Sequence, residues 1–272
     1  MGHGAPGQRA SAQNRGQPVQ TSLRNKTRNK TNSARAIVQR MRPRGLIVGV
    51  LAVTALTFFA LILFVFLKVP EAQPQAGGLA QKIFYFHVPA AYALYVCGGV
   101  CFIASALYLA DPTDKRDAWA KAGAECASAF GGMVMVSGPL WAKKAWGVYW
   151  TWDPRLTSLL LSILIYVALV VLRRFAGNGD AERRFAAAFG ILGTAILPIV
   201  HYSVQLWGGN HPKVLKANGG GGLQAPAMVQ ALLGGFFAMT LLAALLLTLR
   251  AQLAYSQARL LRAEELAPDT IG

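Results

Sequence analysis

Six long apolar stretches run through the chain, separated by more polar connections. A helix that crosses the hydrocarbon core of a bilayer needs about 20 consecutive, mainly apolar residues. Each stretch is close to that length, so the pattern predicts an all-α integral membrane protein with six transmembrane helices. The expected helices cover about residues 46–67, 86–109, 122–141, 156–172, 185–206 and 225–249.

The stretch 122–141 is the least apolar of the six, because it contains a carboxylate and several residues that weaken helices. These residues are Glu125, Gly131, Gly132, Gly138 and Pro139. Small residues let membrane helices pack closely, which favours a helix here as well. Glu125, near one end of this helix, is expected to reach toward the lipid headgroups or to pair with a lysine.

The composition supports a membrane location, with 54% hydrophobic and 14% charged residues. Soluble domains usually contain about 25% charged residues. The net charge is +16, but ten of the 27 Lys and Arg residues lie in residues 1–45, which contain no Asp or Glu. This polar segment is predicted to be a disordered basic cytoplasmic tail that contacts anionic membrane lipid. The uneven charge therefore disfavours nucleic acid as a partner.

The Lys and Arg residues of the loops also predict the orientation, because cytoplasmic loops carry more of them. Twenty of the 27 fall on the side of the tail, and seven fall on the other side. Both termini are therefore expected in the cytoplasm, and the loops 68–85, 142–155 and 207–224 are expected outside. The remaining chain divides into a six-helix membrane domain (46–249) and a second cytoplasmic tail (250–272).

The second outward loop contains an unusual density of aromatic side chains: Trp146, Tyr149, Trp150 and Trp152. Tryptophan is common at membrane interfaces, but an interfacial belt does not need three such rings within seven residues. These flat rings, followed by Arg155, indicate a platform for a large, flat and partly anionic ligand.

The same loop ends in residues that are typical of a helix start. Asp153 is expected to cap the fourth helix, and Pro154 is expected to be its first residue. Asp153 can at the same time position Arg155.

Two histidines fall on the outward side that also carries the tryptophans: His87 opens the second helix, and His211 follows the fifth. Each one alone is as consistent with a helix cap or a carbonyl contact as with a ligand. Together, beside the tryptophans, they indicate a metal or cofactor site. Two histidines do not complete a zinc site, but they supply both axial ligands of a haem iron.

A haem b group also accounts for the neighbouring residues. Its flat apolar face suits stacking on indole rings, and its two carboxylates suit Arg155, Lys143 or Lys144. His201, inside the fifth helix, and Tyr149 are candidates for supporting contacts around the iron ligands. For His201, hydrogen bonding within the helical core is an equal alternative.

The aromatic loop resembles the tryptophan-rich WWD signature of the haem-handling proteins of cytochrome c maturation. It reads Trp146-Gly-x-x-Trp150-x-Trp152-Asp153-x-Arg155-Leu156-Thr157, with Pro154 where Ala is common in the signature. The segments around His87 and His201–His211 are similar to the histidine regions of that superfamily. Six helices with the signature between the third and fourth resemble the haem exporter protein C (CcmC) family. The resemblance covers about residues 46–249 and leaves the basic tail outside.

The resemblance implies a role in haem transport rather than ordinary enzymatic catalysis. Proteins of this type bind haem at the periplasmic face of the bacterial inner membrane and present it to the chaperone CcmE, whose histidine bonds to it covalently. The implied further partners are CcmA and CcmB of an ABC transporter complex, and the small CcmD. By the same resemblance, His87 and His211 are the axial ligands, and the tryptophan motif is the platform at the haem edge.

Three alternatives stay open at this point. The first is a small-molecule transporter with an aromatic outer vestibule, which is expected to have broken helices or charges near the middle of the membrane. The second is a component of a cytochrome c synthase like CcsA. The third is a haem-dependent membrane oxidoreductase, which is expected to bury its haem ligands between helices.

Overall fold

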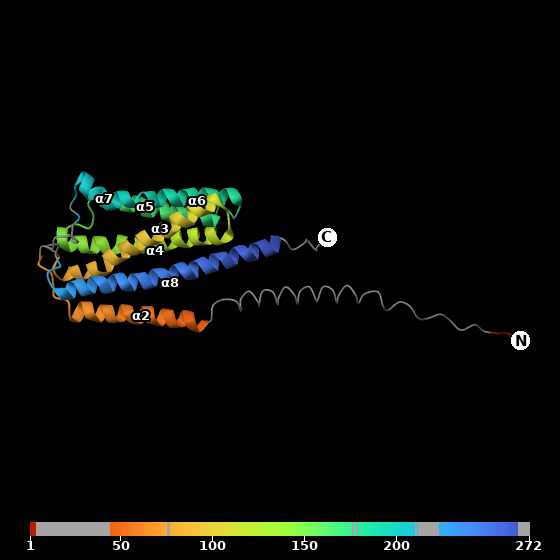
Figure 1. Ribbon diagram of the computed structural model, residues 1–272, viewed down its shortest axis with the longest axis horizontal. Coiled ribbons are helices and arrows are strands. Elements are labelled where there is room, and N and C mark those ends of the chain that lie inside the picture. The colour runs from red at the N-terminus through yellow and green to blue at the C-terminus, as the bar shows by residue number, and fades with distance from the viewer. Residues whose placement is uncertain are drawn as a thin grey trace. The chain divides into compact units, whose positions relative to one another are not determined.

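The computed structural model describes residues 1–3, 44–74, 77–175, 177, 179–209, 211 and 223–265 of the chain. The regular secondary structure of these residues is helical throughout, as the apolar pattern predicts (Figure 1). Its elements are α2 (Arg44–Leu67), the 3-10 helix η2 (Gly78–Ile83), α3 (Phe84–Ala110), α4 (Asp114–Trp146), α5 (Pro154–Phe175), α6 (Asp180–Ala195), α7 (Leu197–Trp207) and α8 (Pro226–Glu265).

The chain divides into two compact units, Met1–Leu51 and Ala52–Gly272. The described part of the first unit consists of Met1–His3 and the start of α2. The expected disordered tail therefore lies almost wholly outside the described residues. The second unit contains the rest of α2 and all the other described helices.

Five helical stretches in the described residues are long and apolar enough to cross a membrane, as expected of an integral membrane protein. Five of the six segments expected from the sequence fall within them. The remaining segment, 122–141, lies in α4, which is a single helix but does not reach the same apolar content. The five stretches are Gly45–Leu67, Gly78–Ala110, Pro154–Phe175, Asp180–Trp207 and Pro226–Ala263.

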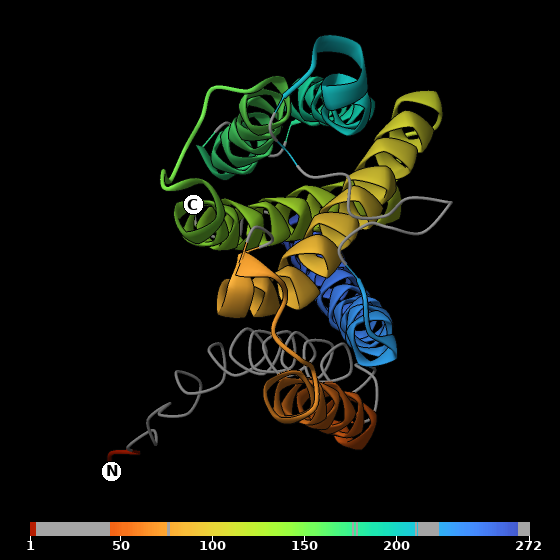
Figure 2. The ribbon, with the colours of Figure 1, turned by 90° about the vertical axis from the view of Figure 1, so that its left-hand side faces the viewer.

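The lower apolar content of α4 follows from its central place in the second unit. α4 packs against α3, α5 and α8, and Figure 2 shows α5, α6 and α7 on one side of the crossed α3 and α4, with α8 on the other side. Protein rather than lipid therefore covers much of α4. Its glycines allow the close contacts: a β-carbon on Gly123 would meet the backbone of Cys101, and one on Gly131 would meet the side chain of Ile163.

Glu125 of α4 forms an ion pair with Arg250 of α8, with 2.6 Å between Oε2 and Nε. The expected pairing of this carboxylate is confirmed in kind, but the partner is an arginine rather than a lysine. The pair ties the N-terminal half of α4 to α8.

The expected fifth helix, 185–206, is in fact two helices. α6 ends at Ala195 and α7 begins at Leu197, so the chain breaks at Ile196, just ahead of Pro198. Proline has no backbone N–H to donate to the carbonyl four residues earlier, and its ring clashes with that carbonyl, which interrupts the helical hydrogen bonds here. The hydroxyl of Tyr95 donates a hydrogen bond of 3.1 Å to the Leu197 carbonyl beside this break.

α8 continues past the expected end at Leu249 as far as Glu265, so most of the expected C-terminal tail is helical. At the other end of the unit, on the left in Figure 1, the starts of α3 and α5 and the ends of α4 and α7 come together. Alternation of helix direction therefore places the aromatic loop and both outward histidines at one end.

Candidate functional site

A cavity of about 640 Å³ lies at the end of the second unit where α3 and α5 begin and α4 and α7 end. We call it the aromatic cavity. The residues predicted from the sequence that line it are His87, Trp146, Tyr149, Trp150, Arg155, His201 and His211. Residues from four separate parts of the chain thus meet around one space, and two of the predicted residues, Trp152 and Asp153, stay outside its lining.

His87 lies in the first turn of α3, directly after η2. Its Nδ1 is 2.8 Å from the hydroxyl of Ser137, and that hydroxyl donates its own proton to the Met133 carbonyl at 2.6 Å. A serine hydroxyl has one proton to donate, so Nδ1 of His87 is the donor to Ser137. The neutral ring therefore keeps its lone pair at Nε2, which is the form that binds a metal through Nε2.

Gly138 explains how α4 accommodates the His87 ring. A β-carbon at this position would lie 3.1 Å from Cε1 of His87, closer than a side chain normally packs. The absence of a side chain at residue 138 thus leaves room for the imidazole beside Ser137.

Arg155, in the first turn of α5, connects His211 to the backbone of α7. Its guanidinium donates to the Val200 carbonyl at 3.3 Å and to the His201 carbonyl at 2.7 Å, and Nη1 lies 3.2 Å from Nδ1 of His211. A guanidinium only donates, so Nδ1 of His211 accepts, and a neutral ring carries its proton at Nε2. His87 and His211 are therefore held in opposite tautomers.

The chain reaches His211 through two glycines after α7. Gly208 and Gly209 have φ angles of 76° and 142°, a region that side chains rarely adopt. A β-carbon on Gly209 would lie 3.5 Å from Asp153. The turn thus packs against the start of α5 and brings His211 back to the cavity.

The tryptophans of the motif separate into two groups. Trp146 and Trp150 line the aromatic cavity, and the buried Nε1 of Trp150 has no hydrogen-bond partner in the part of the chain that the structure describes. Trp152 is 76% exposed and touches Trp150 edge-on, with 5.7 Å between ring centroids. The expected platform therefore consists of two rings that face inward and one that faces outward.

Asp153 has the predicted structural role. Its Oδ1 accepts from the backbone N–H of Leu156 at 2.9 Å, and α5 begins at Pro154. Asp153 is thus the N-cap of α5, which fixes the position of Arg155 two residues later.

The lysines beside the motif lie at the surface. Nζ of Lys143 donates to the Gly147 carbonyl at 2.9 Å and lies 5.2 Å from the ring centroid of Tyr149. Lys144 is also exposed. Both are thus near the rim rather than within the aromatic cavity.

His201 is exposed and contacts two aromatic rings. It makes edge contacts with Tyr95 and Tyr202, with ring centroids 6.5 Å and 4.9 Å apart. Its carbonyl, rather than its ring, is the group that Arg155 holds.

Several cavity residues were not identified from the sequence. Trp141 lines the cavity, donates to Gln81 at 3.1 Å and packs edge-on against Trp146 at 5.4 Å. In the sequence, the position of Trp141 five residues before the motif could have indicated that it belongs to the cavity. Gly138 was attributed only to helix packing and Ser137 was not singled out, because nothing in the sequence pairs α4 with His87. The other aromatic and sulfur-containing wall residues are Phe84, Tyr92, Tyr95, Met135 and Phe236.

The aromatic cavity can hold a flat and largely apolar ligand. Its walls are mainly aromatic and aliphatic, and its polar groups include three imidazoles, one guanidinium and an unpartnered indole N–H. Imidazoles suit a metal ion, and a guanidinium suits a carboxylate.

Comparison with known proteins finds relatives that are named heme exporter protein C. The chain is 35% identical over 153 residues to heme exporter protein C of Bradyrhizobium diazoefficiens, covering 56% of this chain and 58% of the relative. It is 32% identical over 134 residues to heme exporter protein C of Escherichia coli strain K12, covering 49% and 55%. The protein of the same name from Rhodobacter capsulatus is 28% identical over 158 residues, covering 58% and 64%.

The matched segments thus span between 55% and 64% of the length of these relatives. A broader match comes from a family model, which covers residues 30–265. That range includes α2 to α8, the tryptophan motif and all three histidines of the cavity. The chain therefore belongs to the CcmC family, heme exporter protein C.

Proposed function

We propose that this protein binds haem in the aromatic cavity, at the periplasmic face of the bacterial inner membrane, and presents it to the haem chaperone CcmE during cytochrome c biogenesis. The observation that carries the proposal is the convergence of His87 and His211, 124 residues apart in sequence, on one cavity walled by Trp146 and Trp150. Membership of the CcmC family, and the name heme exporter protein C of its relatives, support the same function.

His87 and His211 are the proposed axial ligands of the iron in haem b. His87 is ready for this role, because its hydrogen bond to Ser137 leaves the Nε2 lone pair available. His211 must first transfer its proton from Nε2 to Nδ1 before it binds iron through Nε2, because Arg155 donates to its Nδ1. His201 is proposed as a neighbour of the ligands, since its ring lies among tyrosines at the same cavity.

The remaining polar groups suit the two haem carboxylates. Arg155 provides a guanidinium, Trp150 an unpartnered indole N–H, and Lys143 an ammonium group at the rim. Each is a donor, and charge-assisted hydrogen bonds to carboxylates are stronger than neutral ones. Trp152, outside the cavity, is proposed to contact the chaperone, because it presents a large apolar ring to solvent.

The proposed topology has six spans with both termini in the cytoplasm, and α4 is the additional span. Its 33 residues are about 50 Å long as a helix, which exceeds the roughly 30 Å of a hydrocarbon core. The proposed domains are a cytoplasmic tail over residues 1–45, a membrane haem-handling domain over 46–249 and a cytoplasmic segment after it.

CcmA, CcmB and CcmD are the proposed partners in an ABC transporter complex. The protein assists haem attachment to CcmE without being an enzyme itself.

One observation bears on the alternative of a small-molecule transporter. Transporters place broken helices around their substrates, and the chain breaks between α6 and α7. The carbonyls after this break are already occupied by protein groups: Tyr95 donates to Leu197, and Arg155 donates to Val200 and His201. These hydrogen bonds hold α7 against α3 and α5, which favours a fixed binding site.

The proposal is tested by the absorption spectrum of the purified full-length protein. Two axial histidines give a low-spin haem spectrum, and we expect His87→Ala and His211→Ala each to reduce haem retention about tenfold or to convert the iron to high spin. His3→Ala, a histidine far from the cavity in sequence, is the matched control and should leave the spectrum unchanged. Wild-type haem content and spin state in both cavity variants would refute the ligand assignment.

A further inference from the structure

A second cavity, of about 460 Å³, lies at the opposite end of the second unit. We call it the basic cavity. Its walls come from α4 near Asp117, from the end of α5, from the start of α6 and from α8 beyond Leu253. It shares no lining residue with the aromatic cavity.

Positive charge dominates the lining. Lys121, Arg173, Arg174 and Arg183 face two carboxylates, Asp117 and Glu182. No ion pair joins Lys121 or Arg174 to an acid within the described ranges. The basic cavity therefore has an excess of cationic groups that an anion would neutralise.

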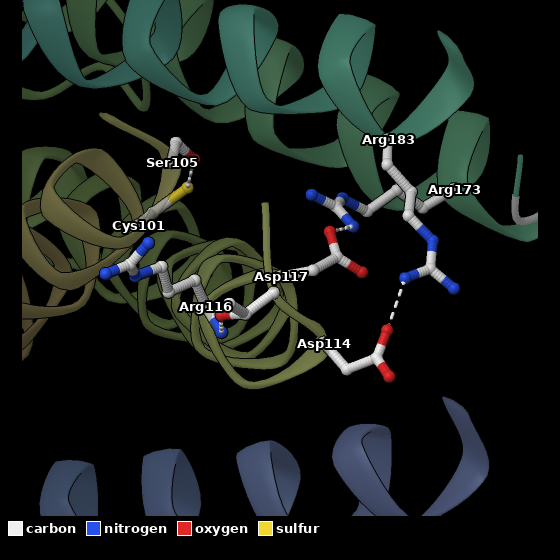
Figure 3. Close-up of polar contacts among 8 residues, drawn as sticks. Cys101, Ser105, Asp114, Arg116, Asp117, Arg173 and Arg183 are labelled. Carbon is white, nitrogen blue, oxygen red and sulfur yellow. Dashed lines mark hydrogen bonds and ion pairs between the residues drawn. The ribbon is translucent and has the colours of Figure 1, made fainter. Parts of the chain in front are cut away.

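Ion pairs fix two of these arginines in place. Arg173 of α5 pairs with Asp117 at 2.6 Å, and Arg183 of α6 pairs with Asp114 at 2.8 Å. Figure 3 shows both arginines reaching from these helices to the acids of α4, with α8 on the far side of α4's acids. The side chain of Arg173 is 9% exposed, and its Nε is a buried donor with no partner among the described residues. The wall is thus preformed, and it still has an unused hydrogen-bond donor.

The length of α8 indicates at which level of the membrane the basic cavity lies. Its 40 residues are about 60 Å long, twice the thickness of the hydrocarbon core. The wall residues that α8 supplies lie between Ala254 and Leu261, beyond the apolar stretch that ends at Leu249. The cavity is therefore at the level of the lipid headgroups, where Leu172 and Leu261 add apolar surface beside the charges.

We propose that the basic cavity binds the phosphate headgroup of an anionic phospholipid from the leaflet at this end. Arginine and lysine recognise phosphate oxygens, and basic pockets between membrane helices hold anionic headgroups. The apolar wall residues contact the start of the acyl chains. The bound lipid fastens α5 and α6 to α4 and α8, independently of haem at the other end.

The test is native mass spectrometry of the full-length protein with phosphatidylglycerol or phosphatidylcholine. We expect selective retention of phosphatidylglycerol by the wild-type protein. The double variant Lys121→Gln/Arg174→Gln spares both ion-paired arginines, and we expect about fivefold weaker binding for each charge removed. Lys115→Gln/Arg184→Gln removes two exposed charges at the same end outside the cavity and should bind like wild type.

Inorganic phosphate, added in excess, distinguishes a lipid site from a simple anion site. Retention of phosphatidylglycerol in its presence supports the proposal, because the apolar wall then contributes to binding. Equal binding of the two lipids would overturn it, as would displacement of the lipid by phosphate alone or full binding by the Lys121→Gln/Arg174→Gln variant. The haem spectrum, measured in the same samples, shows whether each variant is folded.

Discussion

At the scale of single residues, hydrogen bonds distinguish His87 from His211 in the aromatic cavity. Ser137 makes Nδ1 of His87 a donor, and Arg155 makes Nδ1 of His211 an acceptor. The first ring therefore offers a lone pair at Nε2, and the second, when neutral, holds a proton there. Identical side chains thus present a different ring nitrogen as acceptor.

Gly138 gives the sharpest residue-scale prediction. Gly138→Ala adds a β-carbon 3.1 Å from Cε1 of His87, so the ring must shift by a few tenths of an ångström, which disturbs its hydrogen bond to Ser137. We expect haem affinity to fall about tenfold, since the hydrogen bond that orients a metal-binding histidine contributes that much. The measurement is haem titration followed by absorbance.

Gly132→Ala is the matched control, because a β-carbon at Gly132 on the same helix meets nothing within 4 Å. It should bind haem like the wild type. If Gly138→Ala also binds haem normally and gives an unchanged spectrum, the role of this glycine in seating His87 is refuted.

At the scale of elements, α3 and α4 pack closely against each other at Gly123. A β-carbon on Gly123 would come within 2.6 Å of the Cys101 backbone nitrogen, and a backbone cannot rotate aside as a side chain can. Gly123→Ala should therefore destabilise the protein by about 1–3 kcal/mol through overpacking. The unfolding temperature of the detergent-solubilised protein measures this effect.

Gly99→Ala on α3 provides the comparison, since a β-carbon there meets nothing within 4 Å. Alanine favours helix over glycine, so this variant should unfold at the wild-type temperature or slightly above it. Equal unfolding temperatures for the two variants would contradict the close contact between α3 and α4.

At the scale of the whole molecule, the number of spans depends on α4. If α4 crosses the membrane, reporters fused at Pro112 and at Gly147, on either side of it, must report opposite compartments. We expect the Pro112 fusion to be cytoplasmic and the Gly147 fusion periplasmic, because the Lys and Arg excess lies on the side of Pro112. Reporter activity from the same compartment at both positions would reduce the count to five spans and invert part of the topology.

The apolar pattern was sufficient to predict most helices and the end of the molecule at which the site lies. Loop charge and the alternation of helix direction predict that His87, Trp150 and His211 lie at the same end of the molecule, and this prediction needs no knowledge of packing. The break before Pro198 was missed because the sequence stays apolar on both sides of it. Contacts between distant elements could not be foreseen at all: Ser137 against His87, and the outward position of Trp152, depend on how α4 and α5 pack.

The hydrogen bond between Arg155 and His211 has a thermodynamic consequence for any haem in the aromatic cavity. Iron coordination by His211 and donation from Arg155 to Nδ1 exclude each other, because ligation through Nε2 requires a proton on Nδ1. A carboxylate that attracts Arg155 away from His211 would therefore strengthen iron binding, and iron binding would strengthen carboxylate binding by the same factor. The two ends of the ligand would be captured cooperatively, and loss of either contact would promote release of the other.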